Sequence, residues 1–192
     1  MQEFIHNKVK VIEAFFAEFN QTQKLYADKS FDFDQRFTVF LNKLSGYFKD
    51  RGENARESEI LRITSMLHTV RRGFDPSKME KIKSGKRELL WGFSYHGIET
   101  VDTLLQEMYR KEILKLEEGK EILSNLVLNL YQQGFLTDEQ LKGLDSIPKI
   151  ELFWSSLLSQ NGSISFINKK LHTYLITEDI YLLLDEIINK AL

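Results

Sequence analysis

Hydrophobic residues recur every three or four positions through the first seventy residues, which is the spacing of an amphipathic helix. In the first segment this row is Ile5, Val9, Ile12, Phe16 and Phe19. The spacing predicts a helix over about residues 2–27, with a stripe broad enough for burial in a bundle. Similar rows predict a second helix over about 33–51 and a third that starts at Asn54 and runs to Val70.

Polar residues at the expected ends support these helices. Asp32 with Gln35 resembles a capping box, and Asn54 with Glu57 has the spacing of an N-cap and its N3 partner. Gly52 is placed to end the second helix in the left-handed conformation that glycine tolerates. These signals predict side-chain caps at Asp32 and Asn54.

The middle of the chain predicts a short helix followed by a long one. Asp75-Pro76 is a typical helix start, with Asp as N-cap and Pro at the first helical position. Ser84-Gly85 interrupts it, and a long helical pattern then runs over about residues 86–118. Gly92 and Gly97 lie inside that pattern, where each costs about 1 kcal/mol relative to Ala. Such glycines often let another backbone or a ligand come close.

Shorter helices are predicted after Gly119. One covers about residues 120–133, and the next begins with Thr137 as N-cap. Another opens at Pro148 and stops at Asn161-Gly162, and Thr177 caps the last one. The apolar positions of residues 163–176 fit a bent helix as well as an extended segment. The chain is therefore expected to be all-α, a multi-helix bundle of about 7–9 helices, with long helices in the N-terminal half and near 86–118.

A single helical domain over residues 1–192 is expected, with one boundary for subdivision near 73–86. Cysteine is absent, which excludes disulfides, cysteine zinc sites and thiol nucleophiles. The charges of the first helix are unlike a signal peptide, and no apolar run reaches the length of a spanning helix. These features predict a cytoplasmic protein without a membrane segment.

No motif of an enzyme or a nucleotide site is present. Ser84-Gly85-Lys86 lacks the remaining residues of a phosphate-binding loop, and there is no nucleophile elbow. His6 follows Glu3 at metal-ligand spacing, but the pair shares a helical face with charged residues and is expected to be solvated. The sequence therefore predicts no catalytic residue, no metal and no cofactor.

The strongest electrostatic feature is a basic segment at residues 71–92, with seven Lys or Arg and three acids in a chain whose net charge is −2. Its candidate partner-binding residues are Arg71, Arg72, Lys78, Lys81, Lys83, Lys86 and Arg87. The first hypothesis is a non-enzymatic interaction or adaptor protein that binds an acidic protein surface through them. The alternative is a nucleic-acid-associated regulator using residues 71–87, although the pI near 6.1 is low for that class.

A third hypothesis concerns aromatic residues beside the glycines of the long predicted helix. Trp91, Tyr95, His96 and Glu99 could line a small-ligand pocket. His96 and Glu99 lie on one helical face and could form half of a metal site. The alternative is that the glycines let two helices pack closely and the aromatic rings belong to the core.

Overall fold

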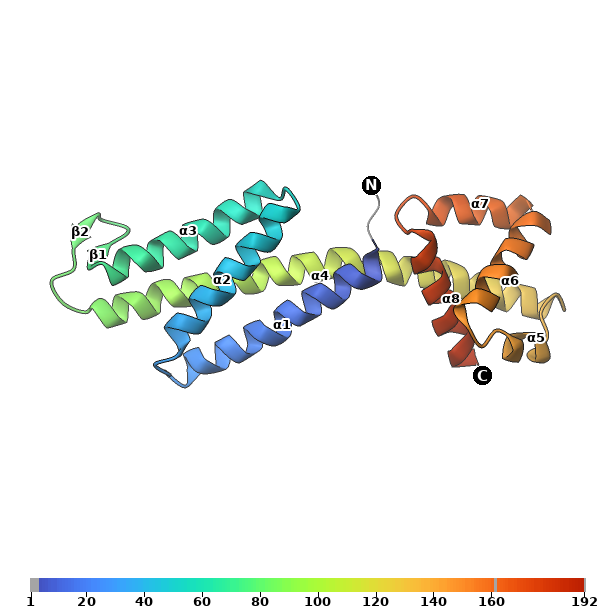
Figure 1. Cartoon of the computed structure of the whole chain (residues 1–192), viewed down its shortest axis with the longest axis horizontal. Helices are drawn as coiled ribbons and strands as arrows, with labels where there is room; N and C mark the ends of the chain where they lie inside the picture. Colours follow the sequence, from blue (N-terminus) through green and yellow to red (C-terminus); the bar gives the residue numbers. More distant parts are fainter. Residues whose placement is uncertain (1–3, 161, 192) are drawn as a thin grey trace. The chain divides into compact units, whose positions relative to one another are not determined.

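The computed structural model describes residues 4–160 and 162–191, and its fold is all-α (Figure 1). The described residues form eight helices and one small antiparallel hairpin. The helices are α1 (Ile5–Ala27), α2 (Phe33–Asp50), α3 (Asn54–Arg71), α4 (Lys86–Gln132), α5 (Asp138–Gly143), α6 (Ile147–Gln160), α7 (Gly162–Leu171) and α8 (Thr177–Ala191). The strands are β1 (Phe74–Asp75) and β2 (Glu80–Lys81). The multi-helix bundle predicted from the sequence is confirmed.

Contacts within the chain divide it into two compact units. The first unit combines the chain up to Val11 with the chain from Tyr109 onwards, and the second is Ile12–Met108. Helices α1 and α4 therefore contribute residues to both units. The single helical domain over residues 1–192, with its boundary near 73–86, stays a prediction.

The second unit has a core rich in phenylalanine. Four of its phenylalanines are fully buried: one from α1, Phe19, and three from α2, Phe37, Phe40 and Phe48. Helix α4 approaches this core at Gly97, where an added Cβ would lie 2.8 Å from Cγ2 of Ile63. A larger residue would have no room there, so Gly97 allows α4 to pack closely on α2 and α3.

The first unit has its own core, built around the last part of α4 and α6 to α8. Trp154 is its largest fully buried side chain, and its indole Nε1 donates to Oδ1 of Asn168 at 3.2 Å. The start of α1 joins this core through Ile5 and Val9. The indole N–H thus has a partner inside an otherwise apolar core.

The break predicted at Gly119 is wrong, because α4 continues through it to Gln132. Gly119 is buried, and a Cβ there would lie 2.6 Å from Cδ1 of Leu175 and 3.1 Å from Cδ1 of Leu183. The helix loses about 1 kcal/mol of propensity at a glycine. Close packing of α8 and the segment before it on α4 requires this glycine, and the helix is maintained by that packing.

The short helix predicted from Asp75-Pro76 is also wrong, because the segment is the β1–β2 hairpin. Oδ1 of Asp75 accepts from the Ser77 backbone N–H at 2.8 Å, and the Met79 N–H donates to the Asp75 carbonyl at 2.8 Å. An aspartate that accepts from the backbone two residues later stabilises a turn as readily as it caps a helix. The turn here is stabilised by that bond.

Other end signals have mixed outcomes. Asp32 makes no side-chain cap, and Asn54 is the first residue of α3 rather than its cap. The capping box of Thr137 and Gln140 is confirmed by both of its hydrogen bonds. Gly162 begins α7 rather than ending α6, and Asn161 lies outside the described residues.

The ambiguous stretch at 163–176 is helical as far as Leu171, where α7 ends in a turn. Helix α8 begins one residue earlier than predicted, because Thr177 is its first residue rather than its cap. Throughout residues 4–160 and 162–191, none of the helices combines the length and the apolar character needed to cross a bilayer.

Candidate functional site

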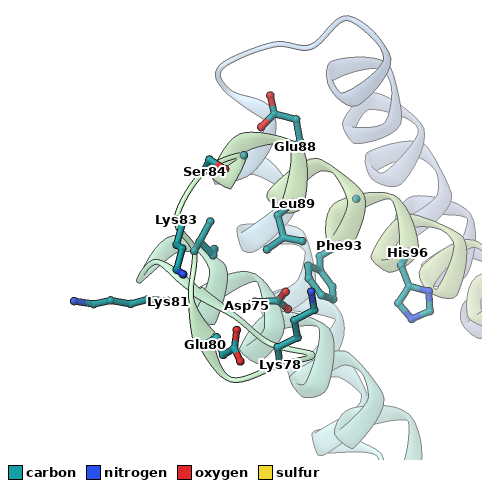
Figure 2. Close-up of a pocket in the computed structure, with 13 residues that line it drawn as sticks. Asp75, Lys78, Glu80, Lys81, Lys83, Ser84, Glu88, Leu89, Phe93 and His96 are labelled. Atoms are coloured by element: carbon teal, nitrogen blue, oxygen red, sulfur yellow. The ribbon is translucent and has the colours of Figure 1, made fainter.

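The hairpin and the first turns of α4 line an open pocket in the second unit (Figure 2). Its volume is about 750 Å³, within the range of about 300–1,000 Å³ that is usual for ligand sites. The lining residues are Asp75, Lys78, Glu80, Lys81, Ile82, Lys83, Ser84, Gly85, Glu88, Leu89, Gly92, Phe93 and His96. The pocket thus lies within the basic segment that the sequence singles out.

The pocket has an apolar part and a basic part. Leu89 and Phe93, on the same face of α4, are only partly covered, as is Ile82 in the connecting segment. The side chains of Lys78, Lys81 and Lys83 are exposed, and Lys81 points away from α4 in Figure 2. Apolar surface beside exposed cations suits a ligand that carries both apolar groups and negative charge.

Carboxylates also line the pocket, but they do not share one role. Asp75 is occupied by the hairpin turn, and hydrogen bonds from the Ser77 hydroxyl and backbone N–H lower the pKa of Asp75. Glu80 and Glu88 are exposed, and Figure 2 shows Glu88 directed away from the hairpin on which Glu80 lies. Glu80 is therefore the exposed carboxylate on the hairpin side of the pocket, where the three lysines also lie.

Arg71 does not belong to the exposed basic surface. Its guanidinium donates to Oδ1 of Asp34 through Nε at 3.1 Å and Nη2 at 2.6 Å. Nη2 also donates to the Thr38 hydroxyl at 2.7 Å. Arg71 thus connects the end of α3 to the first turns of α2, and its role here is structural.

The other predicted partner-binding residues are spread around the same end of α4. Arg72 is exposed just after α3, and Nζ of Lys86 donates to the Arg71 carbonyl at 2.7 Å. The guanidinium carbon of Arg87 lies 5.8 Å from the ring centre of Phe31, a cation–π distance. Of the seven predicted residues, the structure brings three lysines, at 78, 81 and 83, to the pocket.

The residues predicted to line a small-ligand pocket have different surroundings. The Trp91 ring stacks on Phe33 at 5.2 Å and contacts Tyr26 at 4.6 Å, so it is part of an aromatic cluster. Tyr95 is exposed, and a hydrogen bond to the Glu99 carboxylate raises the pKa of Tyr95.

His96 lies at the far end of the hairpin pocket and also lines, with Glu99, a neighbouring depression of about 420 Å³. Residues 4–160 and 162–191 contain no group of three His, Cys, Asp or Glu side chains placed to hold a metal ion. Of the four residues predicted to line a ligand pocket, His96 lines the hairpin pocket and Trp91 belongs to the aromatic cluster.

Sequence reasoning missed Met79. Met79 has a positive φ of 58° at the hairpin turn, and 76% of its surface is exposed. A large apolar side chain in this conformation is uncommon, and it lies beside the pocket lysine Lys78. The Asp75-Pro76 signal pointed to a helix, so nothing in the local pattern indicated a turn tip at Met79.

No protein-family model matches this chain, and neither a curated protein nor a solved structure matches it. The fold and the pocket are therefore interpreted from their own geometry and chemistry. The hairpin pocket, with its lysines and the apolar residues Leu89 and Phe93, is the candidate functional site.

Proposed function

We propose that this chain is a non-enzymatic protein-binding module and that its hairpin pocket accepts an acidic segment of a partner protein. The observation that carries the proposal is the set of three exposed lysines, Lys78, Lys81 and Lys83, on the hairpin side of a pocket whose α4 side includes Leu89 and Phe93. An exposed lysine without an ion-pair partner in its own chain is available to pair with a carboxylate of another protein. Among the described residues, Lys81 and Lys83 form no such pair.

The two parts of the pocket contribute differently to binding. Each solvent-exposed ion pair is worth about 0.2–1 kcal/mol, so three lysines supply a modest share of the affinity. Leu89 and Phe93 add an apolar contribution of about 25 cal/mol for each Å² that the partner covers. The lysines chiefly accelerate association and select an acidic partner, because charge complementarity acts on approach.

This division predicts the composition of the partner segment. The segment should contain several Asp or Glu residues together with apolar side chains. A purely charged peptide would bury little apolar surface against Leu89 and Phe93 and would bind more weakly. The affinity of the partner segment should fall as salt rises, because the lysines are exposed and screening extends over about 10 Å at 0.1 M ionic strength. A nucleic acid offers phosphates for the lysines and bases for Leu89 and Phe93, so it is the alternative occupant in the test.

The test compares two triple variants with the same change in net charge. One carries Lys78→Glu, Lys81→Glu and Lys83→Glu, and the matched control carries Lys111→Glu, Lys142→Glu and Lys169→Glu on exposed positions of the first unit. The probe is a fluorescein-labelled peptide of about twelve residues that alternates Glu with Val, since period-two alternation presents the acids on one side. Binding is measured by fluorescence anisotropy.

We expect the wild type and the control to bind this peptide and the pocket variant to bind at least tenfold more weakly, about 1.4 kcal/mol. A peptide with Gln in place of Glu should bind weakly to all three proteins. Equal affinity of the two triple variants, or no binding of the acidic peptide by the wild type, would contradict the proposal. Tighter binding of an oligothymidylate than of the peptide would favour the nucleic-acid alternative.

A further inference from the structure

The outer edge of β2 carries main-chain N–H and C=O groups that do not pair with β1. Phe74 pairs with Lys81 and Asp75 with Glu80, and the Ile82 N–H donates to the Gly73 carbonyl at 2.9 Å. In an antiparallel ladder this pattern makes Phe74 and Lys81 a non-hydrogen-bonded pair. The N–H and C=O of Lys81 therefore point away from β1, toward the outer side of the hairpin.

This edge is beside the pocket. Glu80 and Lys81, the two residues of β2, both line it, and so do the next four residues up to the start of α4. An unpaired strand edge presents N–H and C=O groups that a further strand can use. A segment entering the pocket in an extended conformation would meet both the lysine side chains and the outward main-chain groups of Lys81.

We propose that the partner's acidic segment binds as an added β-strand on the outer edge of β2, which rests on the function proposed above. Residues two apart on a strand lie on the same side, about 6.6 Å apart, so alternate acids of the partner face the same way. Main-chain hydrogen bonds with Lys81 supply the register, and ion pairs with the lysines of the pocket select the acidic sequence. The apolar residues between the acids face the other side, toward Leu89 and Phe93.

The charge of the edge favours an acidic partner over a second copy of the chain. Edge-to-edge pairing of two β2 strands would bring Lys81 of one copy close to the lysines of the other. Lysines on short edge strands oppose such self-pairing because like charges repel across the interface. The same lysines attract a strand that carries Asp or Glu, so the edge discriminates between the two occupants.

The hairpin is already formed before any strand is added. The carboxylate of Asp75 accepts from Ser77, and the Met79 N–H donates to the Asp75 carbonyl. Gly73 has a φ of 88°, which lets the chain turn from α3 into β1. Preorganisation of the edge lowers the entropy cost of binding, because only the partner segment must become ordered.

The test separates the backbone of Lys81 from its side chain. K81P removes the outward N–H and the charge, whereas the matched variant K81A removes the charge and keeps the N–H. Proline is accepted in an edge strand when its N–H faces solvent, and the extended Glu80 before it is compatible with proline. We expect K81P to bind the Glu-Val peptide at least tenfold more weakly than K81A.

A second measurement covers the case in which K81P disturbs the hairpin. Peptides with a single N-methyl group at successive positions are titrated against wild type, because one set of alternate amides should face β2. Methylation of the peptide amide that donates to the Lys81 carbonyl should weaken binding at least tenfold, and methylation of the amides on either side of it should leave binding within about twofold. Amide exchange of Ile82 in K81P reports directly on whether β1 and β2 remain paired.

The outcomes distinguish the two proposals. Equal binding by K81P and K81A with the hairpin intact, or N-methylation that is equally tolerated at every position, would overturn strand addition and leave acidic-segment binding in place. No weakening by the pocket triple variant would overturn the proposed function itself. Concentration-dependent dimerisation in sedimentation equilibrium that K81P abolishes would show that the edge takes a second copy, and would overturn the acidic occupant.

Discussion

The Nδ1 atom of His6 lies 2.6 Å from Oδ1 of Asp179, a residue 173 positions away in the chain. Asp179 is completely buried, and its carboxylate also accepts the backbone N–H groups of Ile5 at 3.1 Å and His6 at 3.0 Å. These are N–H groups at the start of α1 that have no partner inside their own helix. The first turn of α8 thus caps α1, and both helix dipoles favour a negative charge at this position.

Replacement of Asp179 by Asn should destabilise the protein. The amide keeps the shape but loses the charge that His6 and the two helix starts stabilise, and one of its groups can only donate. We expect D179N to lower the free energy of unfolding by about 3 kcal/mol, as for the loss of one member of a buried pair. Chemical denaturation checks this, with the exposed neighbour E178Q as a control that should change stability by less than about 0.5 kcal/mol.

The same carboxylate should give the protein an acid-sensitive component of stability. Burial alone would raise the pKa of Asp179, but hydrogen bonds from the His6 side chain and from the His6 and Ile5 N–H groups outweigh it and lower the pKa. A lowered folded-state pKa contributes stability that is present above the unfolded value of about 3.9 and is lost as pH falls through the folded value. The stability of wild type should therefore fall more steeply than that of D179N below about pH 4. Parallel curves for the two proteins would contradict this assignment.

Glu112 forms a second buried ionic centre in the first unit. Only 2% of its side chain is exposed, and its two oxygens contact Nζ of Lys8 at 2.7 Å and Nζ of Lys115 at 2.7 Å. Burial would raise the pKa of Glu112, but hydrogen bonds from Lys115 and Lys8 overcome it and lower the pKa. E112A leaves two partly buried ammonium groups without this partner, and it should cost about 3 kcal/mol.

The control for Glu112 is Glu117→Ala, an exposed position one and a half turns along α4. It should change stability by less than about 0.5 kcal/mol. A double-mutant cycle with Lys115→Ala isolates the pair: the Lys115 substitution should cost measurably less when Glu112 is already Ala. Additive effects of the two substitutions would show that the pair contributes no coupling energy.

Two glycines of α4 should respond to alanine in opposite directions. At Gly97 an added Cβ would lie 2.8 Å from Cγ2 of Ile63 and 3.3 Å from ring atoms of Phe37, so G97A must displace core side chains. At Gly92 nothing lies within 4 Å, so G92A gains helix propensity without a clash. We expect G92A to stabilise by up to about 1 kcal/mol and G97A to destabilise by about 1–3 kcal/mol, measured by thermal or chemical unfolding.

Adjacent arginines at the end of α3 should also differ. Arg71 donates to Asp34 and Thr38, whereas Arg72 is exposed. R71A should cost about 1 kcal/mol of stability and R72A less than about 0.5 kcal/mol. Equal costs for the two variants would show that the Arg71–Asp34 interaction contributes nothing net. Neither substitution should alter peptide binding as strongly as the pocket triple variant does.

Much of the helical fold could be predicted because its signals are local. The row from Ile5 to Phe19 predicts α1, and the capping box of Thr137 and Gln140 is present where the sequence indicates it. The basic segment contains most of the residues that line the hairpin pocket. Its pattern did not show that Arg71 turns inward to Asp34, because that contact joins residues 37 positions apart.

Other features depended on packing that no local pattern contains. His6 was expected on a solvated face, yet only 13% of its side chain is exposed and it contacts Asp179. The charged pattern around His6 gave no sign of that partner. Gly119 resembled a helix stop, but Leu175 and Leu183 pack against it and α4 continues. Asp75-Pro76 had the composition of a helix start and forms a hairpin turn instead.

By itself the amino-acid sequence determined the helical class, most helix limits and the position of the basic segment. Periodicity, capping and charge act within a few residues, so the linear pattern contains them. Tertiary structure alone decided the unbroken α4, the hairpin, the burial of Asp179 and the three lysines that share one pocket. Each of these depends on the free energy of contacts between distant residues, which outweighs local preferences of about 1 kcal/mol.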